Sequence, residues 1–396
     1  MDTRPDTRRH DIDALRIIAF GLLILYHTGM VYVADWGYHI KSPYTAEWLQ
    51  LPMLFMNRWR MDLIFLLSGV ATAFLLRNNT AWRFVRQRSW RLLLPLTFGM
   101  LVVVPVQPYV QGVSNGLVAP GFGQFLLDYY SGHAWPAGAF DGWEHGFTWN
   151  HLWYIAYLWC YSLLLPLLRP LLDRLQALVD RLRSWSLLAL PALPLLFYCW
   201  ALKRDYPETH ALLDDWYNHA MYFSIFVYGY WLGRSATLWA ELLRLRKPAV
   251  AAALLLFGAY YAMLTWVPEN PPEWMLLLAW LLRSLYVWCM LAAILGWAYA
   301  LLNKPFAWLR WGKESVYPWY VLHQSLIILI AYWLLPYHLG PLLEPLLVIG
   351  GTVLGCWLLN DGLLRRVACL RACFGLAPLR RSLPAGRCAG QEAATA

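Results

Sequence analysis

Residues 13 to 27 bring two charged side chains and an imidazole into one mostly apolar stretch. Asp13 and Arg16 stand at its start, and the apolar run that follows ends at Tyr26 and His27. In a helix, the eleven positions from Arg16 to His27 make about three turns, so both side chains would share one face about 16 Å apart. A guanidinium binds anions, and an imidazole exchanges protons near neutral pH. This spacing suits a binding site that extends along one helical face and holds a long anionic substrate. The alternative is a helix-end ion pair followed by a packed histidine.

Four further segments carry polar side chains within apolar runs. Asp62 should lie well inside the second run, where a carboxylate needs a cationic partner. Tyr317, Tyr320, His323 and Gln324 would share one helical face. No H-x-x-x-H pair occurs, and we predict neither a metal site nor a serine-nucleophile triad. The four segments are Arg58 to Gly69, Asn150 to Tyr154, Arg283, and Glu314 to His323.

The composition is typical of a membrane protein. Of the 396 residues, 60% are hydrophobic and 14% are charged, whereas soluble domains have about 25% charged residues. The 25 Trp and 24 Tyr suit the two membrane interfaces. The net charge of +9 does not indicate a nucleic-acid partner, because the basic residues fall in short loops on one side of the predicted helices.

Ten apolar runs are long enough to cross about 30 Å of hydrocarbon. We therefore predict an all-α, polytopic membrane bundle of about ten transmembrane helices. The loops after even-numbered runs and the two termini hold 25 of the 32 Lys and Arg residues. By the positive-inside rule, both termini are then cytoplasmic. The runs are residues 14–33, 52–76, 92–110, 150–168, 186–202, 217–233, 248–266, 275–302, 316–335 and 343–364.

The longest loop and the C-terminal segment lie outside these runs. Residues 111–148 contain no Lys or Arg and are rich in Gly, Pro and aromatic residues. Aromatic faces suit the apolar faces of sugar rings, although a loop that rests on the membrane interface would have a similar composition. We expect residues 1–366 to form one transmembrane domain and residues 367–396 to form a basic, disordered cytoplasmic tail.

Five motifs together resemble the integral membrane acyltransferase-3 family, and they cover most of the chain. Two positions depart from the family pattern: Ile17 stands where a Gly is common, and Pro318 interrupts the last motif. Both departures concern local packing. The motifs are Arg16 with His27 (R-x10-H), Arg58 to Gly69 (ending in F-x-x-S-G), Arg83 with Arg86 (R-x-x-R), His151 to Tyr154 (H-L-W-[FY]), and Tyr317, Tyr320 and His323 (Y-x-x-Y-x-x-H).

The resemblance implies an O-acyltransferase of the cell inner membrane that uses acyl-CoA as co-substrate and has no permanently bound cofactor. Arg16, Arg83 and Arg86 would hold the phosphates of acyl-CoA at the cytoplasmic side, since guanidinium groups match phosphate oxygens. Asp13 would orient Arg16. The pantetheine arm is about as long as the separation of Arg16 and His27, so it would bring the thioester to His27.

The resemblance also implies an extracytoplasmic carbohydrate acceptor, a periplasmic or cell-surface glycan. His27 would act as general base on the acceptor hydroxyl, and Tyr320 or His323 would orient the acceptor or stabilise the oxyanion. The short-loop form resembles the branch that modifies periplasmic glucans, with acetyl or succinyl as the acyl group. The residues expected to bind the acceptor are Asp62, His151, Trp153, Arg283 and Glu314.

Two other classes of protein would also place ionisable residues inside the membrane. A transporter or flippase of an envelope sugar or lipid-linked glycan would use Asp62, Arg283 and Glu314 along its path. A non-catalytic scaffold of an envelope assembly has less need of buried charges. Besides acyl-CoA, glycan and lipid bilayer, the sequence is compatible with a homo-oligomer, and we expect no nucleic-acid partner.

Overall fold

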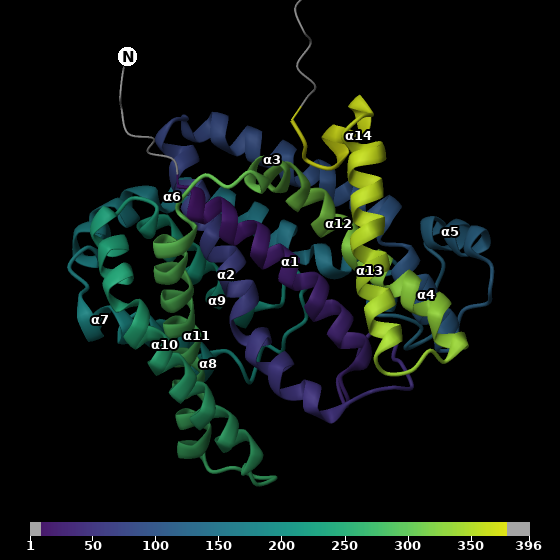
Figure 1. Cartoon of the computed structure of the whole chain (residues 1–396), viewed down its shortest axis with the longest axis horizontal. Helices are drawn as coiled ribbons and strands as arrows, with labels where there is room; N and C mark the ends of the chain where they lie inside the picture. The colour runs from purple at the N-terminus through teal and green to yellow at the C-terminus, as the bar shows by residue number, and fades with distance from the viewer. Residues whose placement is uncertain (1–8, 378–396) are drawn as a thin grey trace, which may run out of the picture.

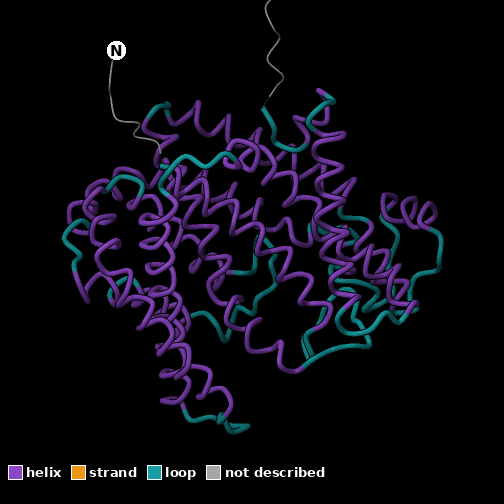
Figure 2. The backbone as a smooth tube through the Cα atoms, viewed as in Figure 1, coloured by secondary structure: helices purple, strands orange, loops and turns teal. Residues whose placement is uncertain are grey.

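Long helices account for most of the chain that the structure describes. The computed structural model describes residues 9–377, and Figure 2 draws them as helices joined by loops. Within these residues, nine helical segments are long and apolar enough to cross a membrane, and α9 adds a helix of 17 residues. Each of the ten predicted runs falls on one of these segments. The predicted all-α polytopic bundle of about ten transmembrane helices is therefore confirmed.

Fourteen α-helices follow one another along residues 9–377. In chain order they are α1 (His10–Tyr32), α2 (Gln50–Arg77), α3 (Ala81–Phe98), α4 (Val106–Ser114), α5 (Phe122–Ser131), α6 (Trp153–Val179), α7 (Ser184–Ala189), α8 (Ala192–Ala201), α9 (Trp216–Leu232), α10 (Ala236–Thr265), α11 (Glu273–Leu302), α12 (Trp308–Leu334), α13 (Leu343–Trp357) and α14 (Ala368–Cys373).

α1 runs through the middle of the bundle and contacts α2, α11, α12 and α13. In Figure 1, the start of α1, α3 and α14 lie along the upper edge, and the loop from α1 to α2 lies along the lower edge. We call the upper edge the basic end, because the arginine-rich segment that begins at Arg77 lies there. The opposite edge is the far end. Both described ends of the chain lie at the basic end.

Glycines let α2 and α9 approach until their backbones touch. A Cβ added to Gly69 would lie 1.9 Å from the carbonyl oxygen of Phe226, and a Cβ added to Gly229 would lie 2.0 Å from that of Leu66. Small residues permit such close approach of membrane helices. This contact fixes the position of α2, which carries Asp62.

The two departures from the family pattern are accommodated by α12. Ile17 packs against Gly312, where an added Cβ would lie 2.6 Å from the Ile17 Cδ1. The absence of a side chain at Gly312 therefore leaves room for the larger residue on α1. Pro318 lies inside α12, which continues through it as one helix from Trp308 to Leu334.

A short helix follows the last long one at the basic end. α14 contacts α3, and the guanidinium of Arg371 is largely buried. It donates to the carbonyl oxygens of Ala377 at 2.7 Å and Arg365 at 2.8 Å. Residues 368–373 of the predicted tail thus form a helix, and residues 378–396 lie outside the described residues.

Candidate active site

Two cavities lie beside α1, which contributes residues to both. The larger has a volume of about 980 Å³ and includes His27, so we call it the His27 cavity. The smaller has a volume of about 710 Å³ and includes Arg16, Arg88 and Arg91, so we call it the basic cavity. No described residue lines both. Arg16 and His27 thus face separate cavities along one helix, about 16 Å apart by helical rise.

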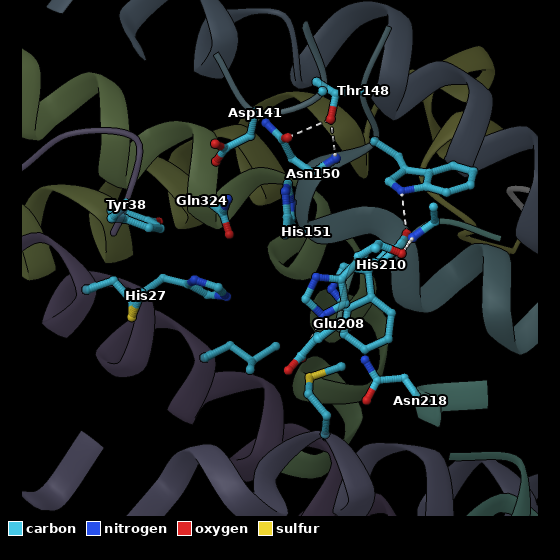
Figure 3. Close-up of a pocket in the computed structure, with 18 of the residues that line it drawn as sticks. His27, Tyr38, Asp141, Thr148, Asn150, His151, Glu208, His210, Asn218 and Gln324 are labelled. Atoms are coloured by element: carbon cyan, nitrogen blue, oxygen red, sulfur yellow. Dashed lines mark hydrogen bonds and ion pairs between the residues drawn. The ribbon is translucent and has the colours of Figure 1, made fainter. Parts of the chain in front are cut away.

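His27 is the cavity histidine whose ring is held by packing. Its Nδ1 is buried and has no hydrogen-bond partner among residues 9–377. Its ring stacks on Tyr38 with centroids 6.3 Å apart and an interplanar angle of 24°. Figure 3 shows His27 on one side of the cavity, with His151 and Glu208 across from it. An imidazole without a fixed partner can accept a proton from a substrate hydroxyl.

Both ring nitrogens of His151 are already engaged. Nε2 lies 3.2 Å from the carbonyl oxygen of Val321, which can only accept, so Nε2 carries the proton. Nδ1 then accepts from the amide of Gln107 at 3.3 Å. The same amide donates to Ser325 at 2.7 Å. His151 therefore ties α12 and α4 together at the cavity wall and has no free nitrogen for a substrate.

His323 lies behind His27, outside the lining of the cavity, and is 1% exposed. Its Nδ1 donates to the carbonyl oxygens of Tyr320 at 2.7 Å and Trp319 at 3.2 Å. Because Nδ1 carries the proton, Nε2 is an acceptor, and it has no partner among the described residues. The rings of His323 and His27 are 5.2 Å apart. His323 can therefore orient His27 but cannot touch a substrate in the cavity.

Tyr38 offers a hydroxyl to the cavity, whereas Tyr320 does not. The hydroxyl of Tyr320 donates to the carbonyl oxygen of His151. The hydroxyl of Tyr38 is buried and has no partner among residues 9–377. Burial raises the pKa of Tyr38 well above its usual value, so this hydroxyl keeps its proton. Sequence reasoning missed Tyr38, because it lies in the loop after α1, where no periodic pattern marks it.

Three arginines and one carboxylate line the His27 cavity from α2 and α11: Arg58, Arg60, Arg283 and Asp62. Asp62 is 4% exposed and Arg283 is 9% exposed. Oδ1 of Asp62 and Nε of Arg283 have no hydrogen-bond partner among the described residues. Arg60 places its guanidinium 3.5 Å from the ring centroid of Tyr26, the neighbour of His27. These groups are available to bind the polar atoms of a ligand.

The loop between α8 and α9 supplies the wall opposite His27, and sequence reasoning missed it. Nε2 of His210 lies 3.1 Å from a carboxylate oxygen of Glu208, and the ring of His210 stacks on Trp153 at 4.3 Å. His210 has φ 57°, a strained conformation for a non-glycine residue. Partial burial raises the pKa of Glu208, but His210 and Arg283 outweigh this effect and hold the pKa at about 2. Glu208 is thus a charged acceptor for hydroxyl groups.

The basic cavity holds several cations and is suited to a polyanion. Arg16, Arg88 and Arg91 line it together with Arg77. Neither Arg16 nor Arg91 has a side-chain hydrogen bond or ion pair among residues 9–377, whereas Nε of Arg88 lies 3.4 Å from the hydroxyl of Ser162. Guanidinium groups without protein partners are available for phosphate oxygens.

One layer of aromatic rings separates the two cavities. The ring of Phe20 lies 5.1 Å from that of Tyr320 and 6.2 Å from that of Tyr154, and the two tyrosine rings are 5.8 Å apart. Phe20 and Tyr154 line the basic cavity, and Tyr320 lines the His27 cavity. A thin ligand that reaches from Arg16 to His27 must displace these rings.

A family model described as an acyltransferase domain, that of the acyltransferase-3 family, matches residues 9–361. The chain belongs to this family. It is a multi-pass membrane acyltransferase, and its motifs lie on the helices that build the two cavities. The predicted family resemblance is therefore confirmed.

Among curated proteins, the acyltransferase is similar to glucans biosynthesis protein C of Escherichia coli, from strain K12 and from its derivatives DH10B and MC4100/BW2952. The identity is 25% over 163 residues. The aligned part covers 40% of this chain and 38% of the length of each relative. No solved structure matches this chain.

Arg83 and Arg86 of the acyltransferase do not join Arg16, contrary to the sequence-based expectation. They are exposed on the outward face of α3 and line no part of the basic cavity. Arg88 and Arg91 repeat the R-x-x-R spacing and face the cavity instead. A helical projection would have found them, because Arg88 and Arg91 share the face of Phe84, which is 1% exposed.

Asp13 and Glu314 also lie away from His27. Asp13, which we expected to orient Arg16 for catalysis, lines the basic cavity with Arg16 and pairs with Lys313 at 3.5 Å. It does not contact substrate atoms at His27. Glu314 is exposed and pairs with Arg365 at 2.5 Å, so it does not bind a ligand in the His27 cavity. Both residues lie on the parts of α1 and α12 at the basic end, where charged side chains are accessible to solvent.

The chain contains the string G-x-S-x-G at residues 112–116. In serine hydrolases this string forms a sharp turn from a strand to a helix. Here Ser114 is the last residue of α4 and is exposed. The local structure is therefore not that of a serine nucleophile.

Proposed function

We propose that this membrane acyltransferase transfers an acyl group from acyl-CoA in the basic cavity to a hydroxyl of a glycan in the His27 cavity. The observation that supports this most strongly is the placement of Arg16 and His27 on one face of α1 but in separate cavities. The pantetheine arm would run along α1 for about 16 Å, between phosphates held by arginines and a thioester beside His27.

The positive-inside rule gives this arrangement a direction. With the basic end in the cytoplasm of a cell whose inner membrane holds the protein, acyl-CoA enters from the compartment where it is made. The acceptor then reaches the His27 cavity from the periplasmic side. The rings of Phe20, Tyr154 and Tyr320 would part around the acyl-bearing arm and close behind it.

The transfer uses groups that have no hydrogen-bond partner among the described residues. Nδ1 or Nε2 of His27 takes the proton of the acceptor hydroxyl while its oxygen attacks the thioester carbon. The hydroxyl of Tyr38 donates to the oxyanion that forms on the carbonyl oxygen. The carbon–sulfur bond then breaks, and the imidazolium of His27 returns the proton to the thiolate of coenzyme A. An ester and free coenzyme A result.

The charges in the His27 cavity support a proposal for the acceptor and the acyl group. Glu208 and Asp62 suit the hydroxyl groups of a sugar, and the name of the E. coli relatives points to a glucan. Arg60 lies beside Tyr26, next to His27. Its guanidinium would pair with the free carboxylate of a succinyl group. Among the two expected acyl groups, this favours succinyl over acetyl.

The transporter alternative is weaker than the transferase. Two cavities on either side of a thin aromatic layer also suit alternating access. Family membership favours acyl transfer, and a carrier needs neither an imidazole nor a hydroxyl left without partners beside its substrate path. Coenzyme A binding to the purified protein distinguishes the two, because a sugar carrier has no use for it.

The test is the substitution His27→Asn in purified protein reconstituted in nanodiscs. With succinyl-CoA or acetyl-CoA and a linear β-glucan, the wild type should add one acyl mass per modified hydroxyl, read by mass spectrometry. Loss of the general base should lower kcat by a factor of about 10² to 10⁴, without loss of coenzyme A binding.

His338→Asn is the matched control. His338 is exposed near the C-terminal end of α12, and its positive φ of 50° is one that Asn also adopts readily. This variant should retain full transfer. If His27→Asn transferred acyl groups at the wild-type rate, the proposed mechanism would be wrong.

A further inference from the structure

The outward face of α3 carries a second pair of arginines that the reaction does not use. Arg83 and Arg86 are exposed, and neither guanidinium has a hydrogen bond or ion pair among residues 9–377. α3 contains no Asp or Glu. Two cations with no carboxylate on their own helix form a site that a single anionic group can occupy.

Large apolar side chains flank these arginines. Trp82 is 74% exposed and Trp90 is 67% exposed, and both line a shallow groove with Arg83, Arg86 and Leu93. We call this surface the α3 outer face. Exposed Trp beside Arg is typical of the level where lipid headgroups meet acyl chains. A free phosphate would use the arginines but would leave the tryptophans in water.

α3 also lies where headgroups are expected. It runs along the basic end of the bundle (Figure 1), and Thr80 caps its first turn through the backbone N–H of Arg83 at 3.4 Å. Its inward residue Phe84 is 1% exposed. The first half of α3, ahead of the apolar run 92–110, has one buried face and one face of Arg and Trp, as expected of a segment at the membrane interface that meets anionic headgroups.

We propose that the α3 outer face binds the phosphate headgroup of an anionic phospholipid, with the guanidinium groups of Arg83 and Arg86 on the phosphate and the indoles of Trp82 and Trp90 against the chains. A second copy of this chain fits less well. A two-fold contact through this face would oppose two Arg pairs without any acidic partner on α3. The lipid would hold α3 at the interface while the opposite face carries Arg88 and Arg91.

The test is lipid binding to the purified full-length protein by native mass spectrometry. Phosphatidylglycerol should bind more tightly than phosphatidylcholine with the same chains. Each arginine near an anionic headgroup contributes about fivefold, so Arg83→Gln with Arg86→Gln should weaken phosphatidylglycerol binding about 25-fold. Binding of phosphatidylcholine should not change.

Arg174→Gln with Arg181→Gln is the matched control. It removes the same charge from exposed positions near the end of α6 and in the loop that follows it, and should change phosphatidylglycerol binding less than twofold. An equal loss in both double variants would show a general charge effect and overturn the proposal. A change of oligomeric state in the Arg83 and Arg86 variant, without a change in lipid binding, would assign the face to a second copy.

The wild type alone also tests the proposal, should the double variant fail to fold. Its preference for phosphatidylglycerol should weaken as NaCl is raised, because the contact is between exposed charges. Equal binding of the two lipids, or a preference that salt leaves unchanged, would overturn it. The proposal does not depend on the acyl donor, since coenzyme A binding and lipid binding are measured separately.

Discussion

The basic cavity and the His27 cavity are built in different ways. The basic cavity takes its arginines from α1, α2 and α3, and its charges are mostly of one sign. The His27 cavity mixes arginines with carboxylates and takes Tyr38, Asp141, Glu208 and His210 from loops. A cavity of one sign suits a polyanion, and a cavity of mixed signs suits a molecule rich in hydroxyl groups. The two halves of α1 thus face two kinds of ligand.

Removal of the cations of the basic cavity should affect one ligand and not the other. Arg88→Gln with Arg91→Gln should weaken coenzyme A binding about hundredfold, because each charge-assisted hydrogen bond is worth about 1.5–3 kcal/mol. Binding of the glycan should not change. Calorimetric titration of the protein in phosphatidylcholine nanodiscs with coenzyme A measures the effect.

Arg83→Gln with Arg86→Gln provides the comparison on the other face of the same helix. It removes the same charge, and the dissociation constant for coenzyme A in neutral lipid should stay within twofold of the wild type. A loss as large as that of the inner pair would mean that the outer pair holds the donor, as the first R-x-x-R motif alone suggested.

Periodicity explains why one cavity could be predicted better than the other. The length and position of the helices, the face of Arg16 and His27, and the membrane class follow from patterns of 3.6 residues and from hydropathy. The pair Arg88 and Arg91 could also have been found from the face of Phe84. These features are local to one helix.

The His27 cavity depends on contacts that no local pattern encodes. Glu208 and Tyr38 lie in loops, and His210 takes a positive φ, so their positions follow from tertiary packing. The motif residues Tyr320, His323 and His151 are close to His27, but their hydrogen bonds to backbone carbonyls appear only in three dimensions. A motif therefore indicates which residues gather, but not which atom remains free.

A second prediction separates the two tyrosines of this cavity. Tyr38→Phe should lower kcat about hundredfold with an unchanged KM for either substrate, because an oxyanion donor acts in the transition state. Tyr320→Phe should instead lower the melting temperature, since it removes a buried hydrogen bond to the carbonyl of His151 worth about 1 kcal/mol. Steady-state kinetics and thermal unfolding of both variants check this. The opposite pattern would return the oxyanion role to Tyr320.

The loop wall opposite His27 should contribute modestly to glycan binding through Glu208. Glu208→Gln should raise the KM for the glycan about fivefold, as one charged hydrogen bond to a hydroxyl becomes a neutral one, and should leave the KM for acyl-CoA unchanged. Glu269→Gln, at an exposed position between α10 and α11, is the matched control and should have no effect.

The pH dependence of the glycan KM is a further test of the role of Glu208. The pKa of Glu208 is held at about 2, below the ordinary value of a glutamate, so the carboxylate stays charged from pH 5 to 8 and the wild-type KM for the glycan should not change through Glu208 in that range. Because the folded pKa is the lower one, any stability that Glu208 contributes is present above the unfolded pKa near 4.3 and is lost as pH falls toward 2. If Glu208→Gln altered the pH profile of the glycan KM between pH 5 and 8, Glu208 would titrate there. Glu208 would then interact more weakly with His210 and Arg283 than it does in the structure. The His27 cavity would lose the charged acceptor that distinguishes it from the basic cavity.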